Sequence, residues 1–217
     1  MSLDGKLRKR LERALAVVDD HGTDGTRLID DAHRLWRRVQ KFLNLNLIPN
    51  GPNGADLDAL ELASYALQLP FRQNKVPTVG KLGRTNLKER AEQAAEMLLG
   101  LLGDDVDESL LDRATRLLHE LPHRSPMLDE ARLLADAVNL EDFGVTGLIQ
   151  QAVQLSRQGE GLMQVAEGAE KREQYGYWNA RLKDGFHFDP VRQMALRRLE
   201  NARTAAKLLA EEMAEDV

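Results

Sequence analysis

The chain has 217 residues, a formal net charge of −5 and no cysteine. The lack of cysteine excludes disulfides and cysteine-ligated zinc, and the acidic balance argues against general nucleic-acid binding. With 42% hydrophobic, 30% charged and only 5% aromatic residues, the composition is typical of a soluble helical protein. The opening segment lacks the apolar core of a secretion signal, and no apolar run approaches the ~20 residues of a membrane span. We therefore expect a cytoplasmic protein that contacts no membrane.

Apolar residues recur at the 3–4 spacing of amphipathic helices along most of the chain. In the second predicted helix, for example, Leu35 and Val39 fall on one face and Arg37 on the other. Segments rich in glycine and proline separate these patterns, and no alternating strand pattern of useful length occurs. We expect helices over residues 4–19, 26–43, 57–69, 86–102, 106–121, 128–140, 144–157, 165–183 and 190–214. The prediction is an all-α fold with essentially no sheet, in a single domain over residues 1–217.

Four stretches occur in the order and spacing found in one large enzyme family. They are DHGTDGTRLIDDA (20–32), DLDALELASYALQLP (56–70), LDEARLLADAVNLEDFG (128–144) and YWNARLKDGFHFDPVRQMALRRLENARTAAKLLAEEM (177–213). Through them the chain, from about residue 10 to 214, resembles the HD-domain metal-dependent phosphohydrolases, especially their small bacterial branch. The resemblance implies a helical bundle of the HD-phosphohydrolase type. In active members, it also implies divalent metals that assist the hydrolysis of phosphate esters.

The residues that hold metal in that family are mostly replaced in this sequence. The resemblance aligns Asp24 with the first histidine ligand, Leu67 and Gln68 with the His-Asp pair, and Asp136 with the last metal-binding aspartate. Leucine donates no electron pair and glutamine carries no charge, whereas a divalent ion needs several N or O ligands in fixed geometry. Asp24 and Asp136 alone would hold a divalent metal only weakly, so we expect no tightly bound cofactor.

Asp24 and Asp136 also have ordinary structural interpretations. Asp24 can cap a helix beginning at Gly25, and Asp136 can pair with a neighbouring arginine. A separate match, HELPH at 119–123, has the H-E-x-x-H form of zinc proteases. That motif requires both histidines on one helical face, and Pro122 interrupts the turn that would hold them there. We therefore interpret HELPH as the end of a helix.

Between Glu61 and Glu89 the sequence contains no acidic residue, but it carries five basic ones: Arg72, Lys75, Lys81, Arg84 and Lys88. By the resemblance, this segment covers the mouth of the former active site, where a basic rim could hold an anion. We therefore predict that Arg72, Lys75, Lys81 and Arg84 bind a phosphate-containing small molecule. The alternative is a solvated loop that binds no ligand, because runs of charge in a sequence are commonly just hydrated surface.

The function that we favour from these observations is a non-catalytic HD-like protein that senses an anionic ligand or mediates an interaction. One alternative is an active phosphohydrolase on nucleotides or other phosphate esters, with a site rebuilt from Asp24, Asp136 and either His21 or His123. A further alternative is a purely structural helical partner protein. The sequence leaves the ligand, any protein partner and any homo-oligomer undetermined. A metal-content measurement would separate the first two functions.

Overall fold

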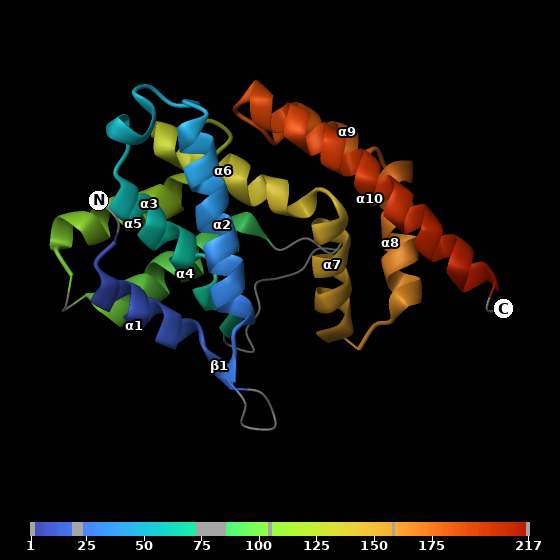
Figure 1. The fold of residues 1–217 in the computed structure, drawn as a ribbon, viewed down its shortest axis with the longest axis horizontal. Coiled ribbons are helices and arrows are strands. Elements are labelled where there is room, and N and C mark those ends of the chain that lie inside the picture. The colour runs from blue at the N-terminus through green and yellow to red at the C-terminus, as the bar shows by residue number, and fades with distance from the viewer. Residues whose placement is uncertain (1–2, 19–23, 73–85, 104–105, 158, 216–217) are drawn as a thin grey trace. The chain divides into compact units, whose positions relative to one another are not determined.

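The computed structural model describes residues 3–18, 24–72, 86–103, 106–157 and 159–215, and the regular elements in them are helices apart from one pair of two-residue strands (Figure 1). The predicted all-α class is confirmed. The α-helices are α1 (Gly5–Leu15), α2 (Arg27–Asn44), α3 (Leu57–Ala66), α4 (Leu87–Leu102), α5 (Glu108–Glu120), α6 (Asp129–Asn139), α7 (Val145–Arg157), α8 (Leu162–Gln174), α9 (Tyr177–Asp184) and α10 (Asp189–Glu215). The described ranges also contain the short 3₁₀ helices η1 (Gly51–Gly54), η2 (Leu69–Arg72) and η3 (Leu140–Asp142). Among the helices in these ranges, none combines the length and the apolar character needed to cross a bilayer.

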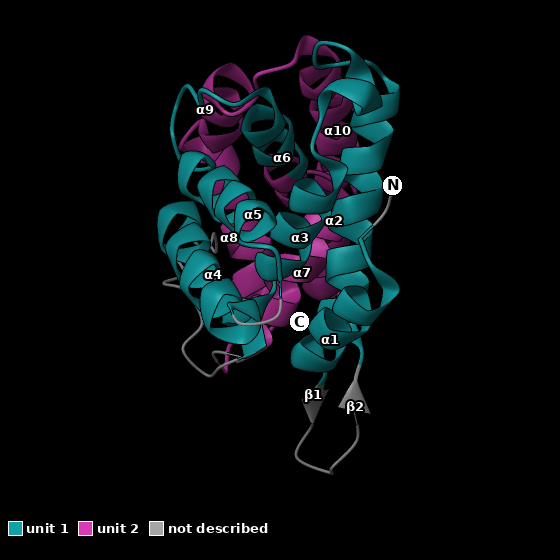
Figure 2. Ribbon diagram, turned by 90° about the vertical axis from the view of Figure 1, so that its left-hand side faces the viewer, with its two compact units in different colours: residues 1–78, 86–137 teal, residues 79–85, 138–217 magenta. Residues whose placement is uncertain are grey.

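The chain divides into two compact units, coloured separately in Figure 2. The first unit consists of residues 1–78 and 86–137, and the second of residues 79–85 and 138–217. The boundary between them falls inside α6, which belongs mostly to the first unit. The expectation of a single domain stays a prediction.

In the first unit, α3 is the central helix. It packs against α2, α4 and α5, and every side chain from Ala59 to Leu67 is buried. The side chain of Asp56 caps its N-terminus by accepting a hydrogen bond from the backbone N–H of Ala59 at 3.0 Å. Its C-terminus precedes Pro70, which lacks the N–H that a further helical turn would need. The helix was predicted to reach residue 69, and it ends at Ala66 before a 3₁₀ turn takes over.

In the second unit, α7, α8 and α10 pack against one another. Helix α8 passes close to α7 at Gly168, where an added Cβ would lie 2.6 Å from Nε2 of the buried Gln151. An aromatic cluster fills the centre beside α9: the ring centroids of Phe143 lie 5.0 Å from Trp178 and 5.3 Å from Phe186. The other buried hydrophobic residues of this unit are leucines, valines and alanines.

The predicted helix over 165–183 is wrong, because two helices occupy that segment. Helix α8 ends at Gln174 and α9 begins at Tyr177, with Gly176 between them at a φ of +62°. This left-handed conformation suits glycine, which has no Cβ to clash with the backbone, and it breaks the run of helical turns.

The chain before α2 also differs from the prediction. The first helix ends at Leu15 rather than at residue 19, and β1 (Val17–Val18) then pairs antiparallel with β2 (Asp24–Gly25). The next helix begins at Arg27, and its N-cap residue is Thr26. The interpretation of Asp24 as the cap of a helix beginning at Gly25 is therefore wrong.

Candidate functional site

The two positions that the resemblance aligns with the His-Asp pair lie at the C-terminal end of α3. Leu67 is fully buried, and its backbone carbonyl accepts a hydrogen bond of 2.9 Å from Nε of Arg90 on α4. Arg90 is itself buried and stacks over the ring of Phe71, 4.9 Å from the centroid. Leu67 thus packs in the core and fixes the end of α3 to α4, and its side chain offers no atom that could bind a metal or an anion.

Gln68 differs from its neighbour because it brings a polar group into the same buried region. Gln68 is only 3% exposed, and its Nε2 atom is buried without a hydrogen-bond partner. A buried amide N–H without an acceptor costs about 1–3 kcal/mol, and native structures contain few of them. At the position where the resemblance implies a metal-binding carboxylate, this chain therefore presents a hydrogen-bond donor.

Asp136 lies on α6 and is fully buried. The carbonyl oxygen of the following residue, Ala137, accepts a hydrogen bond of 2.7 Å from Nη1 of Arg38, a buried arginine of α2. The side chain of Asp24 and the whole of His21 lie outside the described residues. Among the residues that are described, no three histidine, aspartate or glutamate side chains gather in a way that could hold a metal ion.

An ion pair between the buried Glu61 and the partly exposed Arg8 gives α3 a second polar anchor. Glu61 is fully buried, and its carboxylate accepts hydrogen bonds from Nε of Arg8 at 2.8 Å and from the backbone N–H of Leu3 at 3.3 Å. One turn further along, burial raises the pKa of Tyr65 to about 12, and the negative charge of Glu61 adds to this effect. The cluster ties α1 to α3, and its partners are fully provided by the chain, so we assign it a structural role.

The predicted anion-binding residues are only partly covered by the structure. Arg72 is exposed at the end of η2, four residues after Gln68. Lys75, Lys81 and Arg84 lie outside the described residues, so their part in ligand binding stays a prediction. Lys88 is exposed on α4 and lies 3.8 Å from Glu92 in a weak surface ion pair.

The interpretation of HELPH as the end of a helix is confirmed. Helix α5 ends at Glu120, so His119 and His123 do not share a helical face, and both are exposed. The side chain of Glu120 accepts hydrogen bonds from the backbone N–H groups of Met127 at 2.6 Å and Leu128 at 2.9 Å. Glu120 therefore holds the turn that leads into α6.

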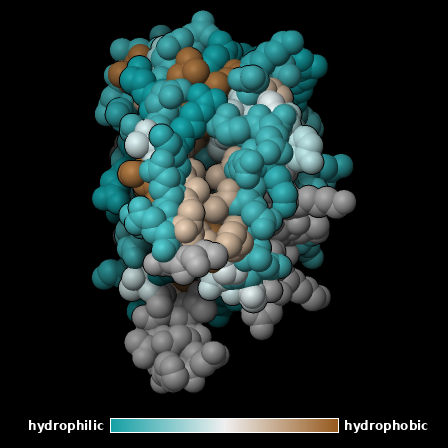
Figure 3. Space-filling view, turned by 90° about the vertical axis from the view of Figure 1, so that its right-hand side faces the viewer, coloured by the Kyte–Doolittle hydropathy of each residue, from teal (hydrophilic) through white to brown (hydrophobic). Residues whose placement is uncertain are grey.

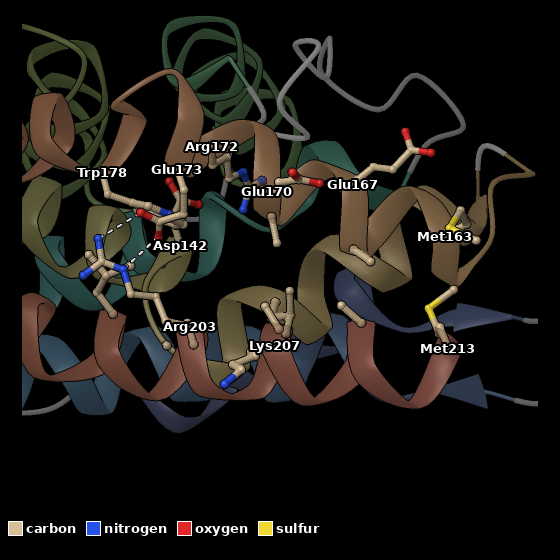
Figure 4. Close-up of a pocket in the computed structure, with 18 of the residues that line it drawn as sticks. Asp142, Met163, Glu167, Glu170, Arg172, Glu173, Trp178, Arg203, Lys207 and Met213 are labelled. Carbon is tan, nitrogen blue, oxygen red and sulfur yellow. Dashed lines mark hydrogen bonds and ion pairs between the residues drawn. The ribbon is translucent and has the colours of Figure 1, made fainter. Parts of the chain in front are cut away.

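A pocket in the second unit was not foreseen from the sequence. It has a volume of about 790 Å³ and lies between α8 and α10, with part of α7 contributing to its lining (Figure 4). This volume is within the roughly 300–1,000 Å³ typical of ligand sites. Its walls are rich in alanines that recur every three or four residues: Ala166 and Ala169 on α8, and Ala202, Ala206 and Ala210 on α10. This alanine spacing could have indicated a groove from the sequence, but the same spacing is also found in two closely packed helices.

Charged side chains mark one end of this pocket, and methionines mark the other. Nε and Nη2 of Arg203 on α10 donate hydrogen bonds of 2.8 and 2.9 Å to the two carboxylate oxygens of Glu173 on α8. The hydrogen bonds to Glu173 raise the pKa of Arg203, which keeps it charged. At the other end, Met163 faces Met213 (Figure 4). The pocket is thus an apolar groove that is closed at one end by a bidentate ion pair.

The fold is shared with crystal structures of Bacillus subtilis YpgQ. The complex of YpgQ with ADP has a TM-score of 0.56 and 15% sequence identity, covering 95% of this chain and 93% of YpgQ. The selenomethionine form has a TM-score of 0.59 and 16% identity, with 95% and 96% covered. A third YpgQ structure has a TM-score of 0.58 and 17% sequence identity, with 95% of each chain covered. No family model matches this sequence, and no curated protein matches it either. At such low identity, the likeness to YpgQ establishes the fold alone.

Proposed function

We propose that this chain is a protein of the HD-phosphohydrolase type that has lost the catalytic metal site and binds a phosphate-containing ligand, as a sensor or interaction module. The four stretches that resemble the HD family lie in the family's order between residues 20 and 213. The fold shared with YpgQ extends over 95% of the chain. Both observations support a common scaffold, and the replacement of the His-Asp pair by Leu67 and Gln68 supports the loss of metal chemistry.

The observation that carries the ligand proposal is the buried amide of Gln68. A metal site needs side chains that donate electron pairs, whereas Nε2 of Gln68 is a hydrogen-bond donor without a partner. A phosphate oxygen is an acceptor, so it would fill this donor and offset the cost of burying it. The exposed guanidinium of Arg72 follows one turn later and supplies positive charge. The N–H groups of these two side chains suit an anion.

The crystal structure of YpgQ in complex with ADP suggests a specific ligand to test. We propose a nucleoside diphosphate as the first candidate, because its phosphates match the donor groups around Gln68 and the basic segment that follows. Inorganic phosphate and sulfate are the simplest comparison ligands, since they carry the anion without the nucleoside.

The experiment is a thermal-shift titration of the purified protein with ADP, phosphate and sulfate. A ligand at about 100 times its Kd stabilises the folded state by about 2.7 kcal/mol. For a chain of this size, that corresponds to a rise in Tm of roughly 5–10 °C. We expect Gln68→Met and Arg72→Ala to reduce the ADP response. Arg37→Ala, which removes another exposed arginine of the first unit, should leave it unchanged.

Two outcomes would overturn the proposal. If none of the three anions raises the Tm of the wild type, the chain is better described as a structural helical partner protein. If stabilisation requires Mn²⁺ or another divalent metal and phosphate is released, the chain is an active phosphohydrolase with a rebuilt site.

A further inference from the structure

The groove between α8 and α10 is a large apolar surface that the proposed ligand site does not use. In the space-filling view, a pale brown strip runs between two hydrophilic walls (Figure 3). Its small alanine side chains leave room for another helix to approach closely. Met163 is 49% exposed at its open end, beside Leu162, which is 59% exposed. Exposed apolar surface of this extent, rimmed by charge, is typical of protein interaction sites.

The two walls of the groove carry opposite charge. The exposed charged residues of the α8 wall are Glu167, Glu170 and Glu173, since its Arg172 is buried over the rings of Tyr177 and Trp178, and the α10 wall has Arg203 and Lys207. Glu173 and Arg203 pair across the groove. Glu167 instead pairs with Lys171 on its own helix, and Lys207 lies 3.5 Å from Glu211 on its own helix. Both pairs are exposed and weak, so their side chains can form ion pairs with other groups instead.

The Glu173–Arg203 pair also fixes the register of the two helices. Helices α8 and α10 run antiparallel, so moving from residue 173 toward 163 on α8 corresponds to moving from 203 toward 213 on α10 (Figure 4). Glu170 is therefore level with residue 206, and Glu167 with residue 209. Lys207 lies between these two levels on the opposite wall.

We infer that this groove is a dimer interface, in which the α8–α10 faces of two copies of the chain pack together about a two-fold axis parallel to the helices. That axis sets α8 of one copy against α10 of the other, antiparallel and at the same level. Glu167 and Glu170 of each copy then meet Lys207 of its partner, and the alanine strips form the apolar centre of a four-helix bundle. A perpendicular two-fold axis would set acidic wall against acidic wall.

The pattern of charge identifies the occupant as a second copy. An interface between identical copies requires one patch to carry both halves of the complementarity, and this groove does so with an acidic and a basic wall.

The first test measures the mass of the wild-type protein in solution by sedimentation equilibrium across a range of concentrations. We expect a dimer. Ala210→Arg places a charge on an exposed groove position without disturbing the helix, and it should weaken the dimer at least tenfold while the dichroism spectrum stays unchanged. The matched control is Leu208→Arg, on an exposed residue of α10 that does not line the groove, and it should remain dimeric.

The second test exchanges the charges. Glu170→Lys and Lys207→Glu should each weaken the dimer about tenfold, because each sets like charges together between the copies. The double variant should regain most of the wild-type affinity, since the pair is re-formed with reversed sign. A monomeric wild type, equal effects of Ala210→Arg and Leu208→Arg, or a double variant weaker than both single variants would overturn the inference.

Discussion

Replacing Gln68 by methionine should make the ligand-free protein more stable and at the same time remove its ligand response. Methionine keeps the unbranched shape and similar volume of glutamine but has no N–H group to bury. The donor at Nε2 is buried without a partner, and such a group costs about 1–3 kcal/mol. We therefore expect Gln68→Met to raise the free energy of unfolding by about 1–2 kcal/mol. Stability would rise because methionine buries no N–H group that lacks an acceptor.

The assay is urea unfolding followed by dichroism, with and without ADP. Without ligand, the midpoint should move to higher urea at an unchanged m-value. With ADP, the wild type should gain stability and the variant should gain much less. Gln93→Met is the matched control, because Nε2 of Gln93 already donates to Glu89 at 3.3 Å, so this change should be neutral or slightly destabilising. The reasoning fails if Gln68→Met destabilises the ligand-free protein by 1 kcal/mol or more, as it would if that amide were already satisfied.

Three further predictions concern the first unit and the basic segment. Arg8→Ala should lower the free energy of unfolding in urea by about 2–3 kcal/mol, because it strands the buried carboxylate of Glu61. This loss of stability is smaller than for a fully buried pair, since Arg8 is partly solvated. Changing both Arg8 and Glu61 to methionine should recover most of the lost free energy of unfolding. The folded state holds the proton of Tyr65 more tightly than the unfolded state does, so stability should be full below pH 10 and fall between pH 10 and about 12. Tyr65→Phe should reduce that fall by about 2–3 kcal/mol, and an identical pH profile in the variant would contradict the burial argument. Finally, Arg84→Ala should weaken ADP binding about tenfold in calorimetry; unchanged affinity would mean that the basic segment is only a solvated surface.

The helices could be predicted because their buried faces repeat every three or four residues. Helix α2 was expected over 26–43 and is found at Arg27–Asn44, and α10 was expected over 190–214 and is found at Asp189–Glu215. The break between α8 and α9 was missed, although the run EKREQ (170–174) holds no apolar residue and Gly176 follows shortly after it. Its cause is the positive φ at Gly176, a property of one residue's backbone that no periodicity reports.

The candidate sites were less accessible from the sequence than the helices. The family resemblance predicts that Leu67 and Gln68 stand in place of a His-Asp pair, but it gives no burial, and the unfilled donor of Gln68 depends on burial. The groove of the second unit was missed for a related reason. Alanines spaced like Ala202, Ala206 and Ala210 fit a tightly packed helix pair as well as an open groove, and the distance between the helices decides which one forms.

The most direct test of the central claim is a calorimetric titration of ADP into the protein in the presence of excess EDTA. The claim is that the chain has kept an anion-binding scaffold and lost its metal chemistry. We predict saturable binding of ADP under these metal-free conditions, with the nucleotide recovered intact afterwards. Binding that appears only when a divalent metal is restored, accompanied by cleavage of the nucleotide, would contradict the claim and identify the chain as a working phosphohydrolase.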